Sequence, residues 1–156
     1  ALVELVALHA PALEFEPIHR VLFGVNAAEL LADLKNAHPG AYEGVGEEGH
    51  VLRYVWEQGA GAVTVPHLTA GLPAATLQSF LDRWLSVHKG RIDYIHGAEV
   101  ARSLADQPGN LAFLLPPMGK EELFPTVLRD GALPRKTFSM GQAQDKRFYL
   151  EGRKIR

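Results

Sequence analysis

Apolar residues recur along the chain with two different periods, and these periods predict a mixture of strands and helices. Alternation over 15–23 predicts a strand with His19 on one face and Arg20 on the other. Pro17 argues against a central position in the sheet for the start of this strand. Shorter apolar runs that stop at turn residues predict further strands over 2–8, 51–56, 62–65, 92–95, 111–115 and 147–155.

A spacing of three and four residues between apolar positions predicts four helices. The clearest helix has Pro73 in its first turn, where a missing N–H is tolerated, and it ends before Gly90. Its buried stripe consists of Leu77, Phe80, Leu81, Trp84 and Leu85. An earlier helix follows the N-cap Asn26, and shorter helices are predicted over 97–106 and 121–129.

The fold class follows from how these segments connect. The strands over 51–56 and 62–65 are joined by the short connection 57–61, so they form an antiparallel hairpin. The glycine- and glutamate-rich stretch 40–50 is predicted to be an exposed loop. We therefore predict an α+β fold, with a mixed or mostly antiparallel sheet and about four helices packed on it. The absence of repeats and linkers predicts one domain over residues 1–156.

Composition excludes several classes of protein. A chain that is 47% apolar and 22% charged can bury a core, so a disordered chain is excluded. There is no cysteine, which excludes disulfide frameworks, thiolate metal sites and cysteine nucleophiles and fits a cytoplasmic protein. No apolar run approaches the roughly 18 residues of a transmembrane helix, so no membrane partner is predicted.

The charge is unevenly distributed, although the formal net charge is only −2. Residues 135–156 contain seven basic and two acidic residues, a local charge of +5, whereas the rest of the chain carries −7. A basic segment on an acidic body attracts anions, but it can equally be a solvated strand that pairs with acidic neighbours. Few aromatic residues lie between the basic ones, so a nucleic-acid partner is not favoured.

The sequence Pro-Arg-Lys-Thr-Phe-Ser-Met-Gly over 134–141 is a candidate anion site. It brings two cations and two hydroxyls into one proline-initiated loop: Arg135, Lys136, Thr137 and Ser139. Such a set can bind phosphate, although the glycine spacing of a P-loop is missing. The alternative is an ordinary loop in which the two hydroxyls bind local backbone groups.

Histidines supply the other candidate chemistry. His19, half-buried on its strand, can act as a general acid or base, or it can be a core histidine with a satisfied hydrogen bond. Arg20 can hold phosphate or pair with a glutamate in the sheet. The remaining histidines never show the spacings His-x-His or His-x-x-x-His, so the sequence predicts no metal site, although distant segments could still assemble one.

Four segments together resemble the prokaryotic Domain of Unknown Function family 1015. They are residues 14–23, Tyr-Ile-His-Gly over 94–97, the segment 133–141 and residues 145–151. The resemblance covers essentially the whole chain and keeps the order of the motifs. Other branches of the family carry a Pro-Pro-Lys-Ser-Thr-like loop at this place. The residues that this chain would share with that loop are Pro134, Lys136 and Thr137. The His-Arg pair of the family would fall on His19 and Arg20.

The resemblance implies that this chain is the C-terminal half of a longer polypeptide. Family members have an N-terminal half with an Asp-Gly-(Asn/His)-His motif, which is absent here, and that half is the implied partner. The family is thought to be related to ParB-like proteins, some of which phosphorylate free serine with a nucleotide. This implies a nucleotide- or phosphate-using small-molecule enzyme that takes ATP or ADP with Mg²⁺ in the full-length protein.

In that reading, Arg135 and Lys136 neutralise phosphate charge and the two hydroxyls donate hydrogen bonds. His19 and Arg20 face the substrate or the missing half. The alternative is a non-catalytic binding or assembly domain, which pairs with the missing half or forms a homodimer. That alternative predicts an exposed apolar patch.

Overall fold

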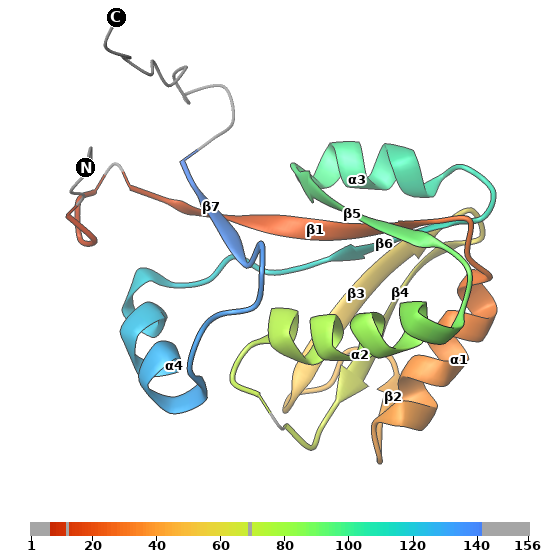
Figure 1. Cartoon of the computed structure of the whole chain (residues 1–156), viewed down its shortest axis with the longest axis horizontal. Helices are drawn as coiled ribbons and strands as arrows, with labels where there is room; N and C mark the ends of the chain where they lie inside the picture. The colour runs from red at the N-terminus through yellow and green to blue at the C-terminus, as the bar shows by residue number, and fades with distance from the viewer. Residues whose placement is uncertain (1–6, 12, 69, 142–156) are drawn as a thin grey trace, which may run out of the picture.

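The computed structural model of the chain describes residues 7–11, 13–68 and 70–141. They form a seven-stranded sheet with four α-helices, so the predicted α+β fold is confirmed (Figure 1). The strands are β1 (Phe15–Phe23), β2 (Tyr42–Glu43), β3 (His50–Trp56), β4 (Gly59–Val65), β5 (Arg91–His96), β6 (Asn110–Leu114) and β7 (Phe138–Met140). The helices are α1 (Ala27–Ala37), α2 (Pro73–Val87), α3 (Ala98–Ala105) and α4 (Leu123–Asp130), the last preceded by the 3-10 turn η1 (Lys120–Glu122).

The strand order is β2-β4-β3-β6-β1-β5, and every strand pair among the described residues is antiparallel. The second half of β1 lies between β5 and β6, while its first three residues pair with β7. Pro17 belongs to this first part, in agreement with the prediction that it stays out of the centre of the sheet.

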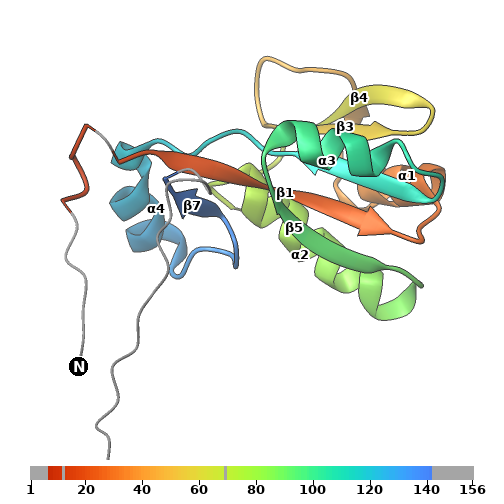
Figure 2. The same cartoon turned by 90° about the horizontal axis from the view of Figure 1, so that it is seen from above.

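The helices form layers on both faces of the sheet. Helices α1 and α2 cover one face and α3 covers the other, while α4 lies near β7 at the end of the sheet away from α1 (Figures 1 and 2). Asn26 caps α1 by accepting a hydrogen bond from the backbone N–H of Glu29, and Pro73 is the first residue of α2, both as predicted. No helix of the described residues is long and apolar enough to cross a membrane.

Two hydrophobic clusters hold these layers together. The larger lies under α1 and α2 and contains fully buried leucines and Phe113. The smaller lies under α3, where Ala101 and Ala105 pack against Val21 and Ala112. Each fully buried leucine contributes roughly 1.5–3 kcal/mol through the hydrophobic effect, so the larger cluster supplies most of the stability. Successive side chains of β1 point to opposite faces of the sheet, so Leu22 packs in the larger cluster and Val21 in the smaller one.

The hairpin differs from its prediction because β4 begins at Gly59, leaving only the turn between the two strands. Glycine usually weakens a strand, which is why the sequence suggested a longer connection. A Cβ at Gly61 would lie 2.4 Å from the hydroxyl oxygen of Tyr54, so a larger residue at this position would require the Tyr54 ring to move. The exposed stretch 40–50 also contains the two-residue strand β2.

The C-terminal segment differs as well. Residues 138–140 form β7 and are not part of a loop, because Phe138 stacks on Phe15 with ring centroids 4.0 Å apart. The helix predicted from residue 121 begins as the 3-10 turn η1 and becomes α-helical at Leu123. Ala7 and Leu8 are not in a strand, and the other positions of the predicted 2–8 strand lie outside the described residues, as does the predicted strand 147–155.

Candidate phosphate-binding site

The candidate site is built around Arg20, whose side chain is fully buried in the middle of β1. Its guanidinium donates hydrogen bonds to the carbonyl oxygens of Arg135 at 3.0 Å and of Lys136 at 2.8 Å. It also donates to the carbonyl of Ile18 and to Oε1 of Gln78 on α2, at 3.3 Å. Burial lowers the pKa of Arg20 to about 10, which leaves the group charged at neutral pH.

These bonds fix the turn formed by residues 134–137, which we call the cationic turn. Lys136 has a φ of +56°, a left-handed conformation that costs a non-glycine residue roughly 1–2 kcal/mol. Thr137 donates its hydroxyl proton to the carbonyl of Pro134 at 2.7 Å, which closes the turn. Thr137 therefore binds a local backbone group in this structure, as the ordinary-loop alternative expected.

The side chain of Arg135 is held in a network with α2 and β5. Its Nε donates to the Tyr94 hydroxyl at 2.6 Å and its Nη2 to Oδ1 of Asp82 at 2.5 Å. Gln78 donates to the same Asp82 oxygen at 2.8 Å, which links the network back to Arg20. The hydrogen bond to Tyr94 is the largest cause of the raised pKa of Arg135.

The Lys136 side chain is exposed, and its ammonium group makes no hydrogen bond or ion pair within residues 7–11, 13–68 and 70–141 that would neutralise it. Ser139 lies further along, in β7, where it pairs in register with Glu16. Ser139 therefore belongs to a strand and not to the turn. The structure thus places Arg20, Arg135, Lys136 and Thr137 together and Ser139 beside them.

A cavity of about 550 Å³ adjoins the cationic turn between α2 and α4. Both signs of charge line it, since Arg135 and Asp82 face it from one side and Arg129 and Asp130 from the other. Arg129 and Asp130 form an exposed ion pair, and Asp130 also accepts a hydrogen bond from the backbone N–H of Gly71 at 2.7 Å. A cavity of this size and lining can hold a small polar molecule.

His19 lies on the opposite face of β1 from Arg20 and lines a second cavity of about 570 Å³, with Arg53 and Arg102. It is only 4% exposed, and its Nδ1 accepts a hydrogen bond from the backbone N–H of Leu115 at 3.2 Å. Neutral His19 therefore carries its proton on Nε2 and can donate a hydrogen bond from that nitrogen. Burial is the main cause of its lowered pKa, followed by the charge of Arg20.

Sequence reasoning missed Gln78 and Asp82, and it assigned no site role to Tyr94, although Tyr94 lies in one of the four segments that carry the family resemblance. Gln78 and Asp82 are four residues apart on α2, a spacing that puts them on one helix face, but nothing in the sequence pairs that face with residue 135. Tyr94 stands opposite Arg20 in the β1–β5 register, and the Arg20 guanidinium lies 5.2 Å from the centre of its ring. The pairing of Arg20 with Tyr94 depends on the register between β1 and β5, which could not be predicted from the sequence.

Comparison with known proteins shows the fold. No family model matches the chain, and no curated protein matches it in sequence. Among solved structures, free serine kinase in complex with AMP is similar, with a TM-score of 0.65 and 19% identity over 88% of this chain and 57% of the kinase chain. A variant of free serine kinase in complex with ADP gives a TM-score of 0.66 at 18% identity with the same coverage.

A conserved hypothetical protein from Pyrococcus furiosus gives a TM-score of 0.65 at 16% identity, over 88% of this chain and 60% of that chain. The chain thus spans less than two thirds of the length of these similar structures. It has a fold that is also found in a nucleotide-bound kinase.

Replacing Arg20 with methionine should destabilise the chain by about 3 kcal/mol, because several buried acceptors lose their charged donor. Urea denaturation measures this change. The matched control is Arg83→Met, on the exposed face of α2, which should change the free energy of unfolding by less than about 0.5 kcal/mol. Trypsin, applied well below the unfolding temperature, should cleave after residues 135 and 136 faster in Arg20→Met than in the native chain, because the turn is no longer held by Arg20. Equal urea midpoints for the two variants would contradict the central role of Arg20.

Stability should decrease as the pH falls from 7 to 5. Burial lowers the pKa values of His19 and His50 in the folded chain, so the unfolded chain takes up protons first below about pH 6.5. Each histidine contributes a slope of at most about 1.4 kcal/mol per pH unit. Urea titrations should show a shallower slope for His19→Asn than for the native chain. A native slope in His19→Asn would refute this assignment.

Proposed function

We propose that the chain is the phosphate-binding, C-terminal half of a nucleotide- or phosphate-using small-molecule enzyme. The observation that carries the proposal is the cationic turn, whose backbone is fixed from below by the buried Arg20. Fixing the backbone in advance lowers the entropy cost of binding an anion there. The similarity in fold to free serine kinase in complex with AMP and with ADP supports the same proposal.

The two cations of the turn have different roles in this proposal. Lys136 supplies a charge that no acidic side chain of the described residues neutralises. Arg135 is paired with Asp82, so an incoming phosphate takes over the planar donors that Asp82 now occupies. Breaking the ion pair between Arg135 and Asp82 costs little free energy, since an exposed ion pair contributes only about 0–1 kcal/mol to stability. Thr137 and Ser139 are the proposed hydroxyl donors, once Thr137 releases Pro134.

The adjoining cavity is the proposed place for the second substrate. Its two cations and two carboxylates complement a small zwitterion, and free serine is the substrate that names the similar kinase. Magnesium, which the family resemblance pairs with ATP or ADP, does not fit the turn itself, whose polar side chains are two cations and one hydroxyl. The carboxylates of Asp82 and Asp130 lie at the cavity, but arginines bind both.

The roles of His19 and Arg20 differ from each other. His19 remains the proposed catalytic residue, and as a neutral imidazole it acts as a donor through Nε2, toward the second cavity and the missing half. Arg20 positions the cationic turn, because its guanidinium is buried and its donors are used. The resemblance to Domain of Unknown Function family 1015 supports a partner half, and the similar structures are longer than this chain.

Lys136→Ala should weaken binding of ADP and of inorganic phosphate by about tenfold, because a charge-assisted contact of roughly 1.5 kcal/mol or more is lost. Alanine retains a Cβ, so the left-handed backbone is equally strained in both proteins and the variant isolates the charge. Isothermal titration of the full chain measures both affinities. Lys89→Ala, another exposed lysine, is the control and should bind as the native chain does. Equal affinities of Lys136→Ala and the native chain would rule out the proposal.

One observation favours the assembly alternative as a second candidate function. Helix α4 exposes three apolar side chains at i, i+3 and i+4: Phe124 at 62%, Val127 at 39% and Leu128 at 86%. Such a stripe on one helix face normally packs against another element. We propose that the missing half of the same polypeptide covers it, and that two copies of the isolated chain pair through it instead.

Sedimentation of the isolated chain should then show a dimer at high concentration. Leu128→Asp should abolish the dimer, since a charge would be buried at its centre. Val100→Asp introduces the same charge on α3, where the native side chain is 53% exposed, and should leave the dimer intact. A monomer that binds no hydrophobic dye at any concentration would exclude this function, whatever the result with ADP.

A further inference from the structure

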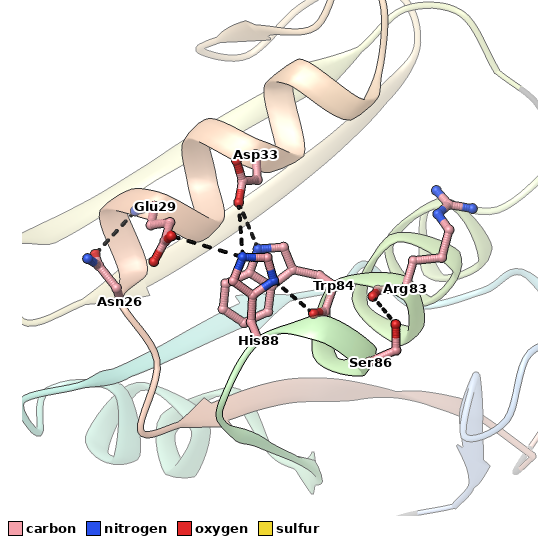
Figure 3. A network of polar contacts seen from close by, with 7 residues as sticks. All are labelled: Asn26, Glu29, Asp33, Arg83, Trp84, Ser86 and His88. Carbon is pink, nitrogen blue, oxygen red and sulfur yellow. Dashed lines mark hydrogen bonds and ion pairs between the residues drawn. The ribbon is translucent and has the colours of Figure 1, made fainter.

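Three side chains from two helices converge at the seam between α1 and α2 (Figure 3). Glu29 and Asp33 stand one turn apart on α1, and His88 follows the last residue of α2. The Nε2 atom of His88 lies 4.0 Å from Oε1 of Glu29 and 3.9 Å from Oδ2 of Asp33. All three ligand atoms lie within 4.8 Å of one another.

The orientation of the His88 ring is fixed by α2 itself. Its Nδ1 lies 3.0 Å from the carbonyl oxygen of Trp84, which can only accept, so Nδ1 carries the proton of the neutral ring. The ring also stacks on Trp84, with centroids 4.2 Å apart and an angle of 3° between the planes. The lone pair of Nε2 therefore faces the two carboxylates.

Nε2 of His88 faces Oε1 of Glu29 and Oδ2 of Asp33 with no hydrogen bond between the ring and either carboxylate. The separations of 3.9 and 4.0 Å are too long for hydrogen bonds and leave space for a small cation between the three atoms. A metal ion at that point would have all three atoms within reach as ligands. The Trp84 indole N–H donates to Oδ2 of Asp33 at 2.9 Å, the kind of outer contact that orients carboxylate ligands in metal sites.

We propose that Glu29, Asp33 and His88 bind a divalent transition-metal ion of the Zn²⁺ class, with water completing the coordination. A point equidistant from the three atoms lies at most about 2.5 Å from each, so small rotations of the exposed Glu29 reach the 2.0–2.2 Å of zinc bonds. One imidazole nitrogen with two carboxylates suits Zn²⁺ better than Mg²⁺ or Ca²⁺, which prefer oxygen ligands only.

The proposed ion cross-links α1 to α2. None of its three ligands lines the cavity beside the cationic turn, so the site is separate from the proposed phosphate chemistry. Its effect is on the packing of the two helices that cover the larger hydrophobic cluster. Zinc binding should therefore raise the thermal midpoint of the chain.

The test uses the full chain, freed of metal with a chelator and titrated with Zn²⁺. One ion should bind per chain in the micromolar range, with a change in Trp84 fluorescence; Trp56→Phe removes the other indole signal. His88→Gln and Glu29→Gln should each weaken binding at least tenfold and lose the thermal shift. His67→Gln, an exposed histidine elsewhere, should bind as the native chain does.

Circular dichroism establishes that the variants are folded, and because Glu29 is exposed its variant remains interpretable even if His88→Gln unfolds. No saturable binding at millimolar zinc would overturn the site. Undiminished binding in Glu29→Gln would do the same, as would an equal loss in His67→Gln. Binding of Mg²⁺ as tight as that of Zn²⁺ would overturn the assigned class of ion.

Discussion

A buried positive charge organises the part of this molecule that carries the cationic turn. The guanidinium of Arg20 is fully enclosed, and a charge in such a place is tolerated only when acceptors surround it. Two of these acceptors are carbonyls of residues 135 and 136, more than a hundred positions away in the sequence. The cationic turn is therefore held in place because the buried guanidinium needs its carbonyl oxygens, while the side chains of Arg135 and Lys136 remain exposed.

Side chains alternate between the two faces of β1, and this alternation determines which residues can share a site. His19 and Arg20 are neighbours in sequence, yet the pleat places His19 at the second cavity and buries Arg20 on the opposite face of β1, against Gln78 and the cationic turn. A reaction that used both residues would need a partner that contacts both faces of the sheet. Otherwise, His19 and Arg20 have separate roles. His19 and Arg20 resemble the His-Arg pair of a family, but this resemblance alone does not show that the two residues act in one reaction.

The local features of the fold were predictable, and the long-range ones were not. The cap at Asn26, the start of α2 at Pro73 and its apolar stripe depend on residues within one or two turns of each other. The contact of Arg135 with Asp82 depends on how α2 packs against the sheet, which no local pattern encodes. The same holds for His88, whose approach to α1 arises from the packing of two helices and not from any histidine spacing.

Lys136 has a further consequence for how this chain can change. Its left-handed backbone favours glycine, while the charge that it presents requires lysine. In the proposed function, stability favours glycine at this position and anion affinity favours lysine. A library sorted only for folding would enrich glycine at residue 136 and lose the charge, so a library that is meant to test the proposed phosphate binding needs a selection for anion binding from its first round.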